Sequence, residues 1–327
     1  MTLYGVCVLL VIFGLLMAFF DLALLGITKS LLRRISRLAA RRRTSAILIS
    51  RFAPAGLAAT LTAFIFIPAW WRFEPKDPGE AASSMLMALA LLAFLPILRG
   101  VHRAAGIFLR TRDRLLLWRR RGRQTCVLRG SIELVEVHSS DLALCVGGYL
   151  RPTIYASSAV MNSLEPEEFA AALAHEASHA EERDPLRFLW MGSCPDFLQL
   201  FGLDEIWRRA FSTACEFAAD AGASDGDPEV ALDLASALLK VARLSSFRPL
   251  PRRALSDVAV SSAFSSRVDL EARVKALTNP SPETAGDDVR FRPWMLAVTV
   301  LLMGVAGALA SERVHGVSEA VGRFLAP

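Results

Sequence analysis

Residues 164–185 read LEPEEFAAALAHEASHAEERDP. The proline suits the first turn of a helix, and the glutamates around it favour the positive end of a helix dipole. The small and apolar residues that follow predict a helix that runs to about Glu182. His175 and His179 are four residues apart, so they lie on the same face of this helix. The stretch therefore predicts a helix that presents two imidazoles side by side.

The same two histidines flank Glu176 in an HExxH pattern, in a chain that has only five histidines. Two imidazoles at this spacing can bind one Zn²⁺ ion. Glu176 projects beside them, where a carboxylate can take a proton from metal-bound water. A surface helix with incidental histidines is the alternative. We interpret the pattern as a catalytic zinc site with Glu176 as the general base.

A catalytic zinc ion needs three protein ligands and an open position for water. The best third candidate is Glu216, in the segment ACEFAAD. Asp220 follows one helical turn later and shares a face with Glu216. We expect Glu216 to bind the zinc ion, and Asp220 to accept a hydrogen bond from the free N–H of a ligand histidine. Spacing alone leaves an ordinary solvated acidic pair open as the alternative.

The composition, 53% hydrophobic, is too apolar for a chain that is only a soluble globule. The excess is concentrated in four runs, each near the ~17–25 residues that a transmembrane helix needs: 3–28, 53–71, 82–98 and 293–310. The first run lacks a basic segment before it and is too long for a cleaved signal peptide. We therefore expect four transmembrane helices. Charged residues flank HExxH closely on both sides, so the motif itself is expected outside the membrane.

Lysine and arginine are gathered in two segments that two predicted spans separate. Segment 29–51 has eight basic residues and no acidic one, and segment 99–123 has nine arginines and one aspartate. The positive-inside rule places both segments in the cytoplasm and both termini outside. Segment 124–291 has 25 acidic and 15 basic residues, a net charge of −10. The positive charge thus marks topology at a lipid bilayer, and we expect no nucleic-acid partner.

Three domains follow from these patterns. Residues 1–123 are expected to hold three spans, 124–291 a cytoplasmic zinc peptidase domain, and 292–327 the fourth span with a short tail. Within 124–291, three short β-rich stretches predict a small antiparallel sheet or hairpin: 132–138, 142–146 and 153–157. Helices are predicted after the HExxH helix, near 203–222, 229–245 and 267–278. The predicted fold class is an α-helical membrane protein with a mainly α peptidase domain.

Several residues and functions stay open at this stage. Thr153–Ser157 is a candidate strand on which a substrate aligns as an added strand. Tyr149 and Tyr155 are candidate donors to an oxyanion, although packing explains both more simply. Asp21 within the first span motivates a transporter as a competing function, and a contact near the cytoplasmic end explains it more simply. A regulatory scaffold with an idle zinc site is a further alternative. The five scattered cysteines are expected to be reduced packing residues.

The segments HEASHAEERD and CEFAADAGA resemble the ExxxD-type gluzincins. Two membrane families share this pattern, namely HtpX-like peptidases and the BlaR/MecR-type penicillin and methicillin sensor-transducer peptidases. The upstream GGYLRPTIYASSAV more closely resembles the sensor-transducer group, and LEARVKALTNP is similar to the helix that closes their peptidase domain. This resemblance implies that Glu216 is a zinc ligand, and Asp184 matches an aspartate that follows the zinc helix in the group.

The resemblance also implies a bacterial cytoplasmic-membrane enzyme with a cytoplasmic zinc domain between its third and fourth spans. Its substrate would be a cytoplasmic protein, such as a transcriptional repressor or the enzyme itself. HtpX-like quality control is the alternative, and a homodimer stays open. After the predicted fourth span only about 17 residues remain, and a folded domain typically needs ~50 or more. We therefore expect no penicillin-binding sensor domain in this sequence.

Overall fold

The computed structural model describes residues 3–73, 82–128, 132–138, 144–246 and 267–279, together with positions 316 and 320. The predicted fourth span at 293–310 and the tail after it lie outside the described residues. The number of spans in the prediction is therefore tested only for the first three.

Three long helical segments occupy the N-terminal part of the chain. Leu3–Ile35, Ala40–Arg72 and Ser84–Arg121 are each long and apolar enough to cross a membrane. The first is helix α1 (Leu3–Ile35). The second comprises α2 (Ala40–Leu61), the π-helical turn η1 (Thr62–Phe66) and α3 (Ile67–Phe73), and the third is α4 (Ser84–Arg121).

All three segments exceed the predicted runs, because much of the basic sequence read as loops is helical. α1 continues to Ile35, α2 begins at Ala40, and α4 continues to Arg121. The C-terminal part of α4 has an apolar stripe between its charged side chains. Leu115 and Trp118 from this stripe contact one face of the sheet. Because this stripe packs on the sheet, α4 continues as a helix past the apolar run.

The remaining elements form the domain that follows α4. Its strands are β1 (Gly122–Leu128), β2 (Ile132–Val137), β3 (Leu144–Gly147) and β4 (Thr153–Ser157). Its helices are α5 (Ser158–Met161), α6 (Pro166–Glu181), α7 (Asp184–Ser193), the 3₁₀ turn η3 (Leu198–Phe201), α8 (Glu205–Ser224), α9 (Pro228–Ser246) and α11 (Arg267–Thr278). The predicted helices after Leu164 all have counterparts within a few residues.

The predicted antiparallel sheet is wrong in its topology. The described strands form a mixed sheet in the order β1-β2-β4-β3, in which β2 and β4 are parallel and the other two pairs are antiparallel. β2 and β3 follow each other in the sequence, but β4 lies between them. All five residues of β4 are buried, and so are all four residues of the edge strand β3, so burial alone does not set the order of the strands.

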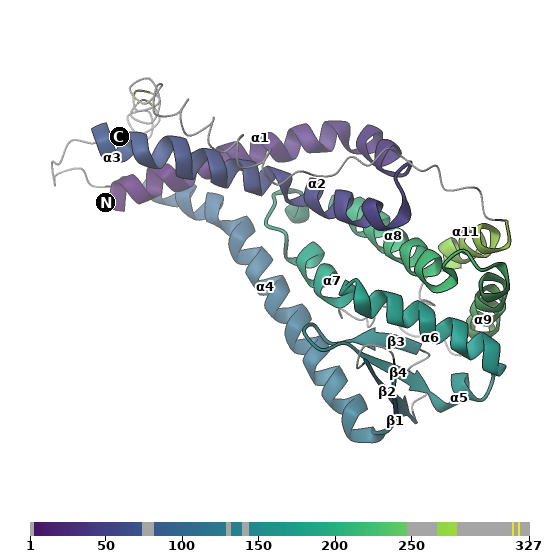
Figure 1. Ribbon diagram of the computed structural model, residues 1–327. Helices are drawn as coiled ribbons and strands as arrows, with labels where there is room; N and C mark the ends of the chain where they lie inside the picture. The colour runs from purple at the N-terminus through teal and green to yellow at the C-terminus, as the bar shows by residue number, and fades with distance from the viewer. Residues whose placement is uncertain are drawn as a thin grey trace.

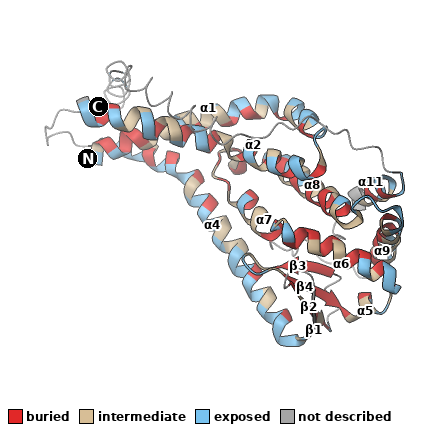
Figure 2. Ribbon diagram, in the orientation of Figure 1, coloured by how far each residue is buried: buried red, intermediate tan, exposed pale blue. Residues whose placement is uncertain are grey.

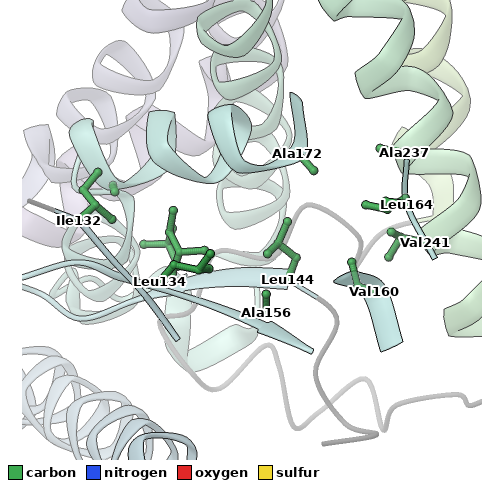
Figure 3. Close-up of a cluster of buried hydrophobic side chains, with 12 residues drawn as sticks. Ile132, Leu134, Leu144, Ala156, Val160, Leu164, Ala172, Ala237 and Val241 are labelled. Carbon is green, nitrogen blue, oxygen red and sulfur yellow. The ribbon is translucent and has the colours of Figure 1, made fainter. Parts of the chain in front are cut away.

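Each face of the sheet has its own hydrophobic core. On one face, α6 and α9 pack on side chains of the strands, as Figure 3 shows for Leu134, Leu144, Ala156, Ala172 and Val241. On the other face, Trp118 of α4 packs against Val135, Val137, Cys145 and Tyr155. Alternate side chains of a strand point to opposite sides of the sheet, which separates the two clusters. The strands and the inner side of α6 are consequently among the buried parts in Figure 2.

The domain lies in the angle between α4 and the other two long segments (Figure 1). α7 packs on α4, and α8 packs on both α2 and α6. The α2–α8 contact is apolar, since Trp207 and Phe211 of α8 are buried in one cluster with Ile47 of α2. α8 thus packs between the HExxH helix α6 and the long apolar helix α2, which belongs to a candidate membrane span.

Candidate metal centre

The HExxH helix begins with a cap that fixes its first turn. The Glu168 carboxylate accepts a hydrogen bond from the backbone N–H of Glu165 at 2.9 Å, and Pro166 occupies the first helical position. Glu168 also accepts from Ser236 at 2.6 Å and from Lys240 at 2.7 Å, both on α9. The cap therefore also ties the start of α6 to its neighbour in the core.

His175, His179 and Glu216 come together at the contact of α6 and α8. The two Nε2 atoms lie 3.1 Å apart. Glu216 approaches them with Oε2 at 3.6 Å from Nε2 of His175 and Oε1 at 3.8 Å from Nε2 of His179. A tetrahedral zinc ion with Zn–N bonds of about 2.0–2.1 Å holds neighbouring ligand atoms about 3.3 Å apart. The donor types and their spacing therefore fit one zinc ion.

Glu176 lies beside this cluster and is fully buried. Within the part of the chain that the structure describes, neither oxygen of its carboxylate has a hydrogen-bond partner. A buried carboxylate without partners is costly, and water held at a metal ion would supply one. Burial raises the pKa of Glu176, an effect that the neighbouring histidines oppose. The environment therefore favours proton uptake by this carboxylate, as a general base requires.

Asp184 contacts the second histidine of the motif. Nδ1 of His179 forms a hydrogen bond with Oδ2 of Asp184 at 2.6 Å. The backbone of Arg183, with φ 55° and ψ 40°, turns the chain sharply between α6 and α7 and brings the buried Asp184 under the histidine. This contact assigns the proton to Nδ1 and leaves Nε2 of His179 free to bind a metal ion.

Asp220 has the corresponding position at the first histidine. Its Oδ1 lies 2.9 Å from Nδ1 of His175, within ion-pair distance but without the angles of a hydrogen bond. Arg273 from α11 then holds Asp220 through two hydrogen bonds, from Nε to Oδ2 at 2.7 Å and from Nη2 to Oδ1 at 2.6 Å. Nη1 of Arg273 also lies 2.8 Å from Oε2 of Glu216. Arg273 is 2% exposed, so this cation is buried among the carboxylates of the site.

Sequence reasoning did not single out Arg273 as a site residue. It lies 53 residues after Asp220, and no spacing rule links the two positions. The one available signal was the similarity of LEARVKALTNP to a closing helix of the domain. A buried arginine in such a helix needs an acidic partner, and the two carboxylates on α8 are that partner.

Opposite charges in the site stabilise the ionised forms of their neighbours. Burial disfavours charge on His175, but the carboxylates of Asp220 and Glu216 outweigh it and raise the pKa of His175 to about 9. Burial also acts against ionisation of Asp220, yet Arg273 and His175 lower its pKa to about 2. Arg273 likewise keeps the pKa of Glu216 below its ordinary value despite burial. The carboxylates of Asp220 and Glu216 are therefore ionised at neutral pH, and their negative charge can balance that of a cation.

Tyr149 and Tyr155 do not join the centre. Both line a cavity of about 210 Å³ between α4 and the β3–β4 turn, and Tyr155 belongs to the core on the face of the sheet away from α6. Tyr149 stacks on Phe108 with ring centroids 5.4 Å apart. The two tyrosines are therefore packing residues, which was the alternative to a role as donors to an oxyanion. The predicted role of Thr153–Ser157 as a substrate-binding edge is wrong as well, because β4 pairs with β2 and β3 on its two sides.

The geometry can be compared with known protein families. Residues 131–247 match the model of peptidase family M48. This M48 domain extends from β2 through α9, so it includes the HExxH helix and Glu216 but not Arg273. The family indicates a protease, and its peptidases are typically zinc-dependent. A comparison with curated proteins found no match to the chain. The match supports the predicted peptidase class, while the BlaR/MecR subgroup stays a prediction.

Proposed function

We propose that the protein is a membrane-anchored zinc endopeptidase that cleaves protein substrates next to the inner face of the membrane. The observation that carries this proposal is the buried group of His175, His179 and Glu216 with the unpartnered carboxylate of Glu176 beside it. The M48 match supports the reaction class. The three long apolar helices support the anchoring, and the charge distribution of the sequence supports the cytoplasmic orientation.

When bound, a zinc ion would supply a Lewis acid and an acidified water molecule. His175, His179 and Glu216 would hold the ion, and Asp220 and Asp184 would keep the two imidazoles in the required tautomer. Glu176 would accept the proton of the attacking water and pass it to the leaving amine. Arg273 keeps Glu216 and Asp220 ionised and in place.

The described edge strand β3 contacts the HExxH helix, but its residues Leu144, Cys145 and Val146 are buried, so β3 offers no open edge on which a substrate strand could align.

The resemblance to the sensor-transducer group suggests a role in signal transduction, with a cytoplasmic repressor or the enzyme's own peptidase region as the substrate. HtpX-like quality control of membrane proteins is the second candidate, favoured by the same M48 match. A homodimer is a further proposal from the sequence. A comparison of protein fragments in cells with the active and the inactive enzyme would distinguish the two substrate classes.

The experiment that tests the proposal uses the full chain in lipid vesicles with one zinc ion per chain. Glu176→Gln should retain zinc and lose proteolysis of an unfolded protein such as casein, because the general base is gone while the ligands are intact. Glu181→Gln, at an exposed position of the same helix, is the matched control and should remain active. Full activity of Glu176→Gln would instead favour a regulatory scaffold in which the zinc site is idle.

A further inference from the structure

The connection between α7 and α8, residues 194–204, is seated between the membrane-type helices. Phe197 packs against the buried cluster of Met17, Ala55 and Ala58, which belong to α1 and α2. On the other side, a Cβ atom added to Gly100 of α4 would lie 3.6 Å from Cα of Pro195, so α4 passes close to the start of the connection. The connection therefore touches all three long helical segments.

Three of these contacts lie within predicted spans, since Met17 belongs to the run 3–28, and Ala55 and Ala58 belong to the run 53–71. With a rise of 1.5 Å per residue, Met17 is about 21 Å along α1 from Leu3, which a hydrocarbon core about 30 Å thick includes if α1 enters the bilayer at its N-terminal end. On α4, Gly100 lies two residues past the predicted run 82–98, so we expect the connection at the boundary between the inner leaflet and the cytoplasm.

Several polar groups of the connection have partners in the protein. Asp21 of α1 accepts a hydrogen bond from the backbone N–H of Phe197 at 2.8 Å. Arg51 of α2 forms a buried ion pair with Asp196. Asp196 also accepts from the backbone N–H of Gln199 at 2.7 Å. Non-helical backbone is tolerated at membrane depth only where its polar groups have such partners. This explains the buried Asp21 without a transport function.

α4 adds further partners at the end of the connection. Nη1 of Arg103 lies 3.0 Å from Oε1 of Gln199 and 3.1 Å from Oδ2 of Asp204. Both acceptors are buried. The charged and amide groups of the connection consequently point inward, toward the helices.

The outward side is apolar, which is the reverse of an ordinary surface loop. Phe201 is 75% exposed and Leu203 is 42% exposed. The adjoining spans present the same character, with Leu22 of α1 at 68% and Val101 of α4 at 62%. Ion pairs within the first turns of α8, such as that of Glu205 with Arg209 at 2.8 Å, begin directly afterwards and suit the headgroup region.

We propose that Phe201 and Leu203 contact lipid acyl chains, so that residues 194–204 form a membrane-embedded connection. A bilayer is the occupant that the observations favour, because the exposed side chains extend the apolar surface of the candidate spans. The proposal rests on the membrane anchoring stated above. α8 follows directly and carries Glu216, so the contact with lipid fixes the start of the helix that supplies the third zinc ligand.

The test places an environment-sensitive NBD fluorophore on Phe201→Cys, and separately on Leu203→Cys, in the full chain. The protein is reconstituted in vesicles of phosphatidylcholine and phosphatidylglycerol. Leu91→Cys on α4 is the reference for lipid, and Leu150→Cys, 81% exposed in the β3–β4 turn, is the reference for water. Labelled wild-type protein gives the background from the native cysteines. Doxyl-labelled lipid and aqueous iodide are the two quenchers.

Labels at positions 201 and 203 should match Leu91→Cys, with blue-shifted emission, strong loss of fluorescence with doxyl lipid and little loss with iodide. Labels that match Leu150→Cys would overturn the proposal, as would labels that neither quencher reaches, since these would lie under a second protein surface. If Leu91→Cys itself were quenched by iodide alone, the membrane anchoring would fail, and this outcome is distinct from failure at residue 201.

Discussion

Arg273 binds Asp220 in a bidentate manner, with Nε 2.7 Å from Oδ2 and Nη2 2.6 Å from Oδ1. The same carboxylate lies 2.9 Å from Nδ1 of His175, and the same guanidinium lies 2.8 Å from Glu216. One side chain from α11 therefore contacts both Glu216, the proposed third zinc ligand, and the carboxylate that lies beside His175. Because the M48 match ends before α11, the centre depends on a part of the chain beyond that match.

The first prediction concerns this arginine. Arg273→Met should lower zinc affinity by about 10–100-fold, the usual effect of removing a partner of a metal ligand. Competition with a chromophoric chelator measures the change. Lys275→Met, exposed on the same helix, should leave the affinity unaltered. Equal affinities in a folded Arg273→Met variant and the wild type would show that the guanidinium does not position the ligands.

The second prediction concerns stability and pH at Glu168. Burial acts against its ionisation, but Lys240, Ser236 and the N–H of Glu165 outweigh it and lower its pKa below 4.5. A carboxyl whose pKa is lower in the folded state contributes stability above that ordinary value, and the contribution is lost as the pH falls through the folded-state pKa. Glu168→Gln should therefore reduce the free energy of unfolding by about 1–3 kcal/mol at neutral pH.

Urea unfolding in detergent at several pH values measures this difference. It should shrink below pH 4.5, where the wild-type carboxyl itself becomes protonated. Glu167→Gln, an exposed neighbour, is the control and should show no such pH dependence. A deficit of Glu168→Gln that stayed constant down to acid pH would exclude the ion pair as its origin.

The third prediction concerns the buried pair of Arg51 and Asp196. Arg51→Met leaves a carboxylate buried without its cation, which should cost about 3–5 kcal/mol of stability. The double variant Arg51→Met/Asp196→Asn retains an acceptor for the N–H of Gln199 and removes the charge, so it should be more stable than the single variant. Thermal unfolding in detergent compares them. A double variant that is less stable than the single one would contradict the assignment.

The fourth prediction concerns removal of the metal. A ligand that binds only the folded state stabilises it, so chelation should lower the unfolding temperature of the wild-type protein. The same treatment should leave His175→Ala unaffected, because that variant holds no tight zinc ion to lose. His138→Ala, at an exposed histidine, should respond like the wild type. A chelator effect of the same size in His175→Ala would place the metal elsewhere.

Local patterns in the sequence predict the helices and the pair of His175 and His179, while the resemblance to the gluzincins, and not spacing, indicates Glu216 as their partner. The HExxH helix has its own cap and period, and Glu216 and Asp220 share a helical face, so each choice depends on neighbours in the sequence. The order of the strands is different. β3 and β4 are both fully buried although one is an edge strand and the other is central, and the alternation within one strand does not state which strand lies next to it.

The missed features share the same physical origin. Arg273 meets Asp220 only through the packing of α11 on α8, and residue spacing does not encode that contact. The apolar surface of Phe201 and Leu203 is short and lies between charged residues, so a hydropathy window passes over it. The predicted span 82–98 is shorter than α4, because a run of arginines is typical of a loop at the membrane surface, whereas here these arginines belong to the helix.

Zinc content tests the central claim most directly. Elemental analysis of the purified full chain should find one zinc ion per wild-type chain, and a substoichiometric amount in a folded variant that carries His175→Ala, His179→Ala and Glu216→Ala together. Wild-type protein that takes up no stoichiometric zinc, or a triple variant that retains a full equivalent, would contradict the assignment of this centre.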